Sequence, residues 1–133
     1  MRYIKGEKDR ALKCCEKAIE IDPDRSGAWM RKANFLELEG YIEHALDAVN
    51  KAVAINPDCP SSWFVKSGIL KKMGRFEEAL DAIEHTTDIR DDNCFDWYRK
   101  HFILKALGRN KDAAKAKSRY IELRNMERPD ERL

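Results

Sequence analysis

Several features that often reveal an activity are missing from this chain of 133 residues. It has no apolar run long enough to cross a bilayer and no signal-peptide pattern at its N-terminus, which predicts a soluble, cytoplasmic protein. Neither of the glycine-rich phosphate-binding motifs, G-x-G-x-x-G and G-x-x-x-x-G-K-[ST], occurs in it. No nucleophile stands beside a base and no carboxylates are paired for chemistry. The sequence therefore predicts no catalytic residue, and we expect a protein that is not an enzyme.

Cysteine and histidine are too scattered to predict a metal site. The four cysteines form no C-x-x-C pair and the three histidines lie at unrelated positions. Cys59 and Cys94 occupy nearly equivalent turns of a repeat described below, so we expect them about 10 Å apart, too far for a disulfide. We expect reduced cysteines and no cofactor.

What the sequence does contain is a repeat of 34 residues. Four glycines are spaced at this interval: Gly6, Gly40, Gly74 and Gly108. Three tryptophans keep the same interval: Trp29, Trp63 and Trp97. An alanine follows each glycine by five residues, and leucines recur in phase four residues before and six residues after most of them. A period of this length indicates units that cannot bury their apolar faces alone and stack on their neighbours to do so.

Each unit is predicted to be a pair of helices. Residues 29–39 carry apolar side chains at helical spacing, and Gly40 then offers the left-handed conformation that closes a helix. A second apolar pattern covers residues 42–54 and ends before Pro57, which cannot continue a helix. The predicted unit is helix, tight turn, helix, turn.

These residues resemble the tetratricopeptide repeat, whose 34-residue unit has an aromatic near the start of its first helix, a glycine between its helices and a proline at its end. The resemblance implies an all-α fold, a right-handed α-solenoid of antiparallel helix pairs. It divides the chain into a partial unit (1–25), full units (26–59 and 60–93), a C-terminal unit with a capping helix (94–127) and a tail (128–133). It also implies a protein-binding scaffold.

Three features depart from the family pattern. Lysine stands three residues after each tryptophan, where the family prefers leucine: Lys32, Lys66 and Lys100. His101 replaces the usual small residue in the last unit. Lys117 stands where Cys15, Val49 and Ile83 stand in the earlier units, which predicts that the last helix is a polar cap.

The N-terminal unit holds mainly its second helix, because Met1 lies five residues before Gly6. Leu12, Cys15 and Ile19 then lack the helix that normally covers them. Three interpretations stay open: the chain is a fragment of a longer array, the helix is a simple cap, or the bare face pairs with another copy or a partner. The last makes these three residues candidates for self-association into a homo-oligomer.

The resemblance also places a groove on the first helices of the units. The candidate peptide-binding residues are Met30, Arg31, Asn34, Phe64, Val65, Lys71, Lys72, Phe95, Tyr98, Arg99, Phe102 and Lys105. An apolar strip flanked by cations suits an extended or helical peptide with bulky apolar and acidic side chains. The alternative is that some of these side chains pack between neighbouring helices.

Two partners are disfavoured. The clamp that grips the acidic tails of Hsp70 and Hsp90 chaperones would need polar residues where Met30, Val65 and Phe95 stand, and only Asn34 and Arg99 match it. Residues 94–133 hold 11 Lys and Arg against 6 Asp and Glu, but the chain as a whole carries only +2, which argues against nucleic acid. We expect a peptide-binding scaffold, with assembly through exposed end faces as the alternative.

Overall fold

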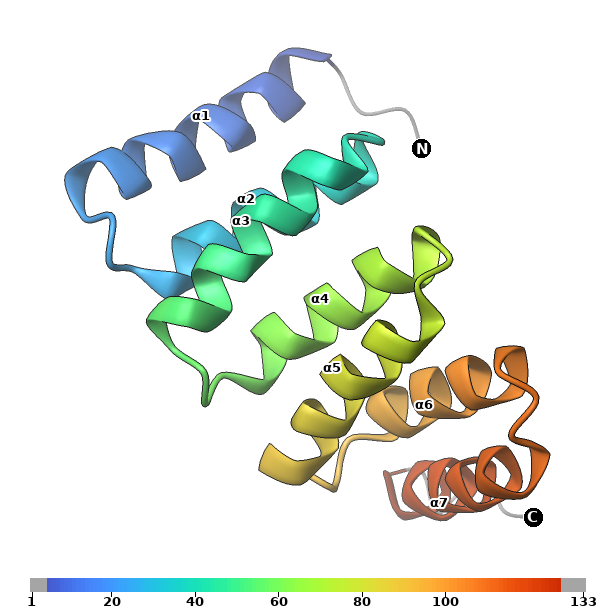
Figure 1. Cartoon of the computed structure of the whole chain (residues 1–133). Helices are drawn as coiled ribbons and strands as arrows, with labels where there is room; N and C mark the ends of the chain where they lie inside the picture. Colours follow the sequence, from blue (N-terminus) through green and yellow to red (C-terminus); the bar gives the residue numbers. More distant parts are fainter. Residues whose placement is uncertain (1–4, 128–133) are drawn as a thin grey trace.

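The computed structural model describes residues 5–127, and these residues form seven helices and no strand (Figure 1). The helices are α1 (Lys5–Ile21), α2 (Ser26–Leu38), α3 (Ile42–Ile55), α4 (Pro60–Lys72), α5 (Phe76–Ile89), α6 (Cys94–Ala106) and α7 (Asn110–Glu127). The predicted tail, residues 128–133, lies outside the described residues. Helix α2 begins three residues before the apolar pattern that predicted it, because its first turn carries the small residues Ser26 and Gly27.

The turn between the two helices of a unit is set by its glycine. Gly40, Gly74 and Gly108 have φ values of 90°, 76° and 77°, as predicted. In the first of these turns Gly40 N donates to Glu37 O and Tyr41 N donates to Leu36 O. This pair of bonds is the Schellman arrangement, and equivalent bonds form at Gly74 and Gly108. A side chain at these glycines would meet no neighbour but would be strained by the positive φ.

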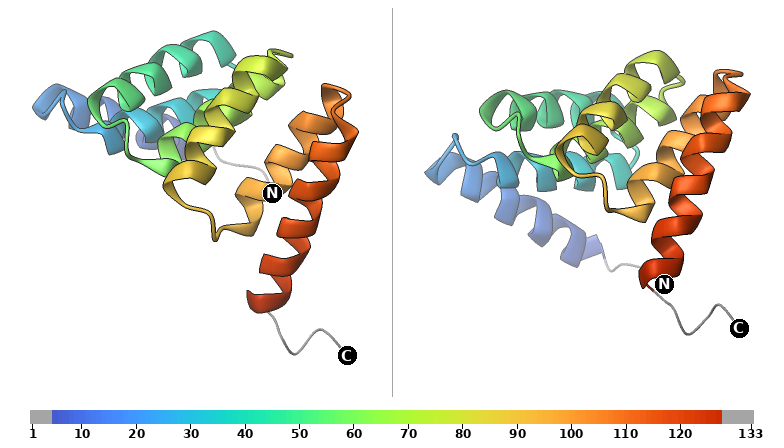
Figure 2. Two further views of the ribbon diagram at one scale, coloured as in Figure 1. Left: turned by 60° about the horizontal axis from the view of Figure 1, so that its bottom comes forward. Right: turned by 90° about the horizontal axis from the view of Figure 1, so that it is seen from below.

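The helices stack in one direction, so that α1 and α7 lie at opposite ends of the array (Figures 1 and 2). Within a unit α2 packs on α3, α4 on α5 and α6 on α7, and each second helix also packs on the first helix of the next unit. Two buried clusters result, one around Val49 and Ile69 and the other around Leu70, Ile83 and Ile103. This packing is that of an α-solenoid.

The three tryptophans have a shared environment that accounts for the unusual lysines. Each indole Nε1 donates to a carbonyl six residues earlier, on Pro23, Pro57 and Asp91, at 2.7 to 2.9 Å. Each lysine that replaces the family's leucine lies over the ring three residues before it, with Nζ 5.0 to 5.6 Å from the ring centroid. The lysines thus replace leucine by covering the indole with a cation.

A second basic residue, 22 positions after each tryptophan, adds to this environment in the first two full units. Lys51 Nζ lies 5.2 Å from the Trp29 ring, and the His85 ring stacks on Trp63 at 4.1 Å. In the third unit Arg119 holds the same position and donates to the carbonyl of Asp91, the residue whose carbonyl also accepts from Trp97. Each indole is therefore fixed to the turn before its helix, and basic side chains from both helices of the unit lie near it or near that turn.

Candidate functional site

Three exposed aromatic side chains lie together on α6. Phe95, Tyr98 and Phe102 are 67%, 52% and 47% exposed. Their spacing of three and four residues places them on one face of the helix. The Tyr98 ring is braced from one side by Tyr120 of α7, with ring centroids 5.2 Å apart. We call these three residues the α6 stripe.

Arg99 lies beside the stripe and reaches back to the preceding unit. Its Nη1 donates to Phe64 O at 2.7 Å and to Ser67 Oγ at 3.3 Å, and its guanidinium carbon lies 3.7 Å from the centroid of the Phe64 ring. Gly68 makes this approach possible, since a Cβ at that position would lie 2.9 Å from Nη1. The α4–α6 contact therefore holds a guanidinium between an aromatic ring and a bare stretch of helix.

No carboxylate within residues 5–127 forms an ion pair with Arg99. Burial lowers the pKa of its guanidinium, and the more distant charges of Glu37 and Asp96 oppose that effect. A partly buried guanidinium without an ion-paired acid among residues 5–127 can bind an anionic group, because its charge is not neutralised there.

Lys71 adds a second cation to the same place. Its Nζ lies 4.7 Å from the centroid of the Phe102 ring. Burial lowers the pKa of Lys71, and the neighbouring charge of Arg99 lowers it further, while Glu37 opposes both effects. Glu37 itself is paired with Lys72 at 3.2 Å. We call Arg99 and Lys71, with the rings of Phe64 and Phe102 that they cover, the α4–α6 site.

The other residues predicted for the groove fall into two groups. Phe64 and Val65 are half-buried and pack against the two core clusters, so they lie between the site and the core. Met30 is also half-buried, whereas four polar residues are exposed. Those four are Arg31, Asn34, Lys72 and Lys105. The exposed apolar strip is therefore concentrated on α6 and does not run evenly along the array.

The residues predicted for self-association lie on α1, which packs mainly on α2. Leu12, Cys15 and Ile19 are each half-buried. Burial raises the pKa of the Cys15 thiol, and the charge of Arg31 opposes that rise. These residues are partly covered by α2 and partly open.

Repeat position places Gly68 and Glu37 on the groove side of their helices, but it does not predict that Arg99 lies against Gly68 or that Glu37 pairs with Lys72. Gly68 is a glycine inside a predicted helix and does not end it. Such a glycine is a sign in the sequence that a neighbouring group approaches the helix backbone. No comparable sign marks Glu37, whose pairing with Lys72 depends on how α2 and α4 pack.

Comparison with known proteins agrees with this fold. A family model described as tetratricopeptide repeat matches residues 3–25, 26–59 and 60–93, more than half of the chain. The protein is an α-solenoid, and it belongs to the tetratricopeptide repeat family. A search of curated proteins gives no match.

Solved structures with the same fold include those of MamA. A crystal structure of MamA is 16% identical, with a TM-score of 0.82 over 90% of this chain and 70% of that one. MamA from Desulfovibrio magneticus RS-1, from residue 41 to its end, is 19% identical, with a TM-score of 0.82 over 92% of this chain and 70% of that one. At these identities the likeness concerns the fold alone.

No described helix is both long and apolar enough to cross a membrane. Across residues 5–127, no three His, Cys, Asp or Glu side chains gather in a group that could hold a metal ion.

Proposed function

We propose that this protein is a non-enzymatic scaffold that binds a segment of a partner protein along the concave face of α2, α4 and α6. The partner segment presents apolar side chains to the α6 stripe and a carboxylate to Arg99 and Lys71. The observation that carries this proposal is the α4–α6 site itself, where two cations lie against aromatic rings and neither forms an ion pair with an acid of residues 5–127. Membership of a family of protein-binding scaffolds supports it.

The chemistry of the site limits what can bind. Exposed aromatic side chains supply most of the binding energy in interfaces of this kind, and a guanidinium binds a carboxylate with direction as well as charge. Since Arg99 Nη1 is already bonded to Phe64 O, the rest of the guanidinium is left for the ligand. A short segment with one acidic residue near two bulky apolar residues matches this arrangement.

An array of 12-residue synthetic peptides with systematic placement of Asp, Glu, Leu and Phe tests the proposal. We expect the full chain to retain peptides that combine an acidic and an apolar residue, and Phe95→Ala with Tyr98→Ala to remove that retention. Both side chains are more than half exposed, so the variant should melt like the wild type. Arg99→Met should weaken the preference for acidic peptides, because Lys71 is then the one cation left in the site, and should leave the retention of apolar peptides unchanged.

Arg109→Met is the matched control, because Arg109 is an exposed cation that pairs with Glu77 away from the stripe. It should leave the retained peptides unchanged. Retention of apolar peptides without any acidic preference would contradict the role of Arg99, and retention that survives the double aromatic variant would contradict the site altogether.

A further inference from the structure

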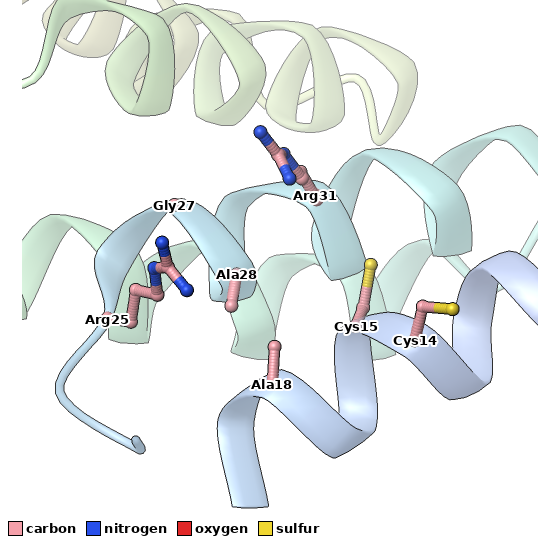
Figure 3. Close-up of a pocket in the computed structure, with 7 residues that line it drawn as sticks. All are labelled: Cys14, Cys15, Ala18, Arg25, Gly27, Ala28 and Arg31. Atoms are coloured by element: carbon pink, nitrogen blue, oxygen red, sulfur yellow. The ribbon is translucent and has the colours of Figure 1, made fainter. Parts of the chain in front are cut away.

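A pocket of about 180 Å³ lies between α1 and α2, at the N-terminal end of the array. Ala18 of α1 and Ala28 of α2 face each other across it, and Cys15 lies on the same side of α1 (Figure 3). Arg25 and Arg31 also line it. We call this pocket, with the open face of α1 around Cys15, the α1–α2 notch.

The later units show what covers the corresponding face of a second helix. Ala45 and Val49 of α3 have no exposed area, and neither do their equivalents Ala79 and Ile83 of α5. The first helix of each unit provides that cover, α2 for α3 and α4 for α5.

In α1 the equivalent positions, Ala11 and Cys15, are only half-buried. Figure 1 shows α1 at the edge of the array, with α2 and α3 on one side of it and no described helix on the other. The shape of the notch is therefore that of a site for one more helix, packed as α2 packs on α3.

Charge specifies the helix further. Neither Arg25 nor Arg31 makes a side-chain hydrogen bond or an ion pair with another of residues 5–127. Arg31 holds the same repeat position as Arg99, which donates to a carbonyl of the preceding first helix. Arg31 is thus placed to do the same to a helix that enters the notch.

Two arginines without an ion pair among residues 5–127 favour an acidic occupant over a second copy of this chain. If two copies paired through their notches about a two-fold axis, Arg25 and Arg31 of each would face the same arginines of the other. Like charges brought together in this way oppose association. A helix with a carboxylate near the arginines meets no such cost.

We propose that the α1–α2 notch binds an amphipathic helix of a partner protein, which packs on α1 as α2 packs on α3 and presents a carboxylate to Arg31. Its apolar face covers Leu12, Cys15 and Ala18 in the way that α2 covers the equivalent residues of α3. This site is distinct from the α4–α6 site and does not depend on it.

A pair of synthetic peptides tests the proposal with the full chain. Each peptide carries residues 26–40 of this chain, a first helix of the repeat, labelled with fluorescein. One has Asn34→Glu and the other Asn34→Lys. Position 34 is equivalent to Gly68, whose side of the helix lies against Arg99, so the new charge should lie against Arg31.

We expect fluorescence anisotropy to show at least tenfold tighter binding of the Glu peptide than of the Lys peptide. In the Arg31→Glu variant the preference should reverse. Arg31 is exposed, so this variant should keep the wild-type helical signal and melting curve. Lys117→Glu on α7 is the matched control, and it should leave the preference unchanged.

Alkylation of the cysteines by iodoacetamide, followed by mass spectrometry, locates the bound peptide. The Glu peptide should slow the labelling of Cys15 at least several-fold and leave that of Cys59 unchanged. Equal binding of the two peptides, or unchanged labelling of Cys15, would overturn the proposal.

Two other outcomes would also overturn it. If binding is lost in the Phe95→Ala and Tyr98→Ala variant and is insensitive to Arg31→Glu, the peptide occupies the α4–α6 site. If light scattering shows that the chain alone is a dimer and that Arg31→Glu changes its dissociation, the occupant of the notch is a second copy. If the Glu peptide binds at the notch as expected but the peptide array gives no retention, this inference stands and the proposed function does not.

Discussion

Replacing Gly68 by alanine tests the position of Arg99 through the sign of a stability change. In the interior of a helix, this replacement ordinarily stabilises a protein by about 1 kcal/mol, because glycine loses more backbone freedom on folding. At this position the new Cβ would lie 2.9 Å from Arg99 Nη1 and 3.2 Å from Cζ. The guanidinium must therefore move away from α4.

The cost of that movement follows from the contacts that it weakens. The hydrogen bond from Nη1 to Phe64 O is 2.7 Å long, and bonds made by charged groups contribute about 1.5–3 kcal/mol. The contact of the guanidinium with the Phe64 ring adds about 0.5–1 kcal/mol. Because a long side chain can relax part of this loss, we expect Gly68→Ala to lower the free energy of unfolding by about 1 kcal/mol, net of the gain in helix propensity.

Urea denaturation followed by circular dichroism measures the effect in two backgrounds. With Arg99→Ala already present, the clash is gone and Gly68→Ala should stabilise by about 1 kcal/mol. Gly27→Ala is the matched control, since a Cβ at Gly27 of α2 would meet nothing within 4 Å. Equal stabilisation by Gly68→Ala in both backgrounds would refute the close approach of Arg99 to this helix.

Three further predictions concern single buried or charged groups. Ser62→Ala should raise the free energy of unfolding by about 1 kcal/mol in urea denaturation, because Ser62 Oγ is buried and has no hydrogen-bond partner among residues 5–127. The equivalent residue of α2 is already alanine, Ala28. A loss of stability would contradict this prediction. Asp96→Asn should lower the free energy of unfolding by about 2–3 kcal/mol, because the buried Asp96 accepts two hydrogen bonds from Arg90, at 2.7 and 3.0 Å. A change below about 0.5 kcal/mol would argue against this ion pair. Burial and the charge of Arg99 lower the pKa of Lys71 in the folded state. Just below pH 10.5 the unfolded state therefore binds more protons than the folded state, so the free energy of unfolding rises with pH there. Lys71→Gln should flatten this rise in melting curves measured across that pH range, and an unchanged slope would count against the shift.

The residues that repeat with the period of 34 predicted the scaffold. Gly40 predicted a left-handed turn, and the structure has φ of 90° there. The apolar pattern of residues 42–54 predicted a helix, and two residues of that pattern, Ala45 and Val49, are fully buried. These predictions succeed because they depend on contacts within one unit or between neighbouring units, which every repeat makes in the same way.

The candidate site was less predictable because its contacts differ from unit to unit. Arg99 was assigned to the groove from its repeat position, but its bond to Phe64 O depends on Gly68, 31 residues earlier. Lys66 looked like a departure from the family, yet it covers the Trp63 ring. In each case a side-chain direction is decided by residues that the periodic pattern leaves free to vary.

The regular turns have a consequence for how such a protein can change in length. Removing residues 60–93 takes out one whole period, so every turn and every bond from an indole to the preceding turn keeps an equivalent. Arg99 would then face α2, with Met30 in place of Phe64 and Asn34 in place of Gly68. The shortened array would have lost both the aromatic ring and the bare backbone on which the guanidinium rests. Units can thus be gained or lost with the pattern of turns and helix stacking preserved, while each such event changes what the inner surface can bind.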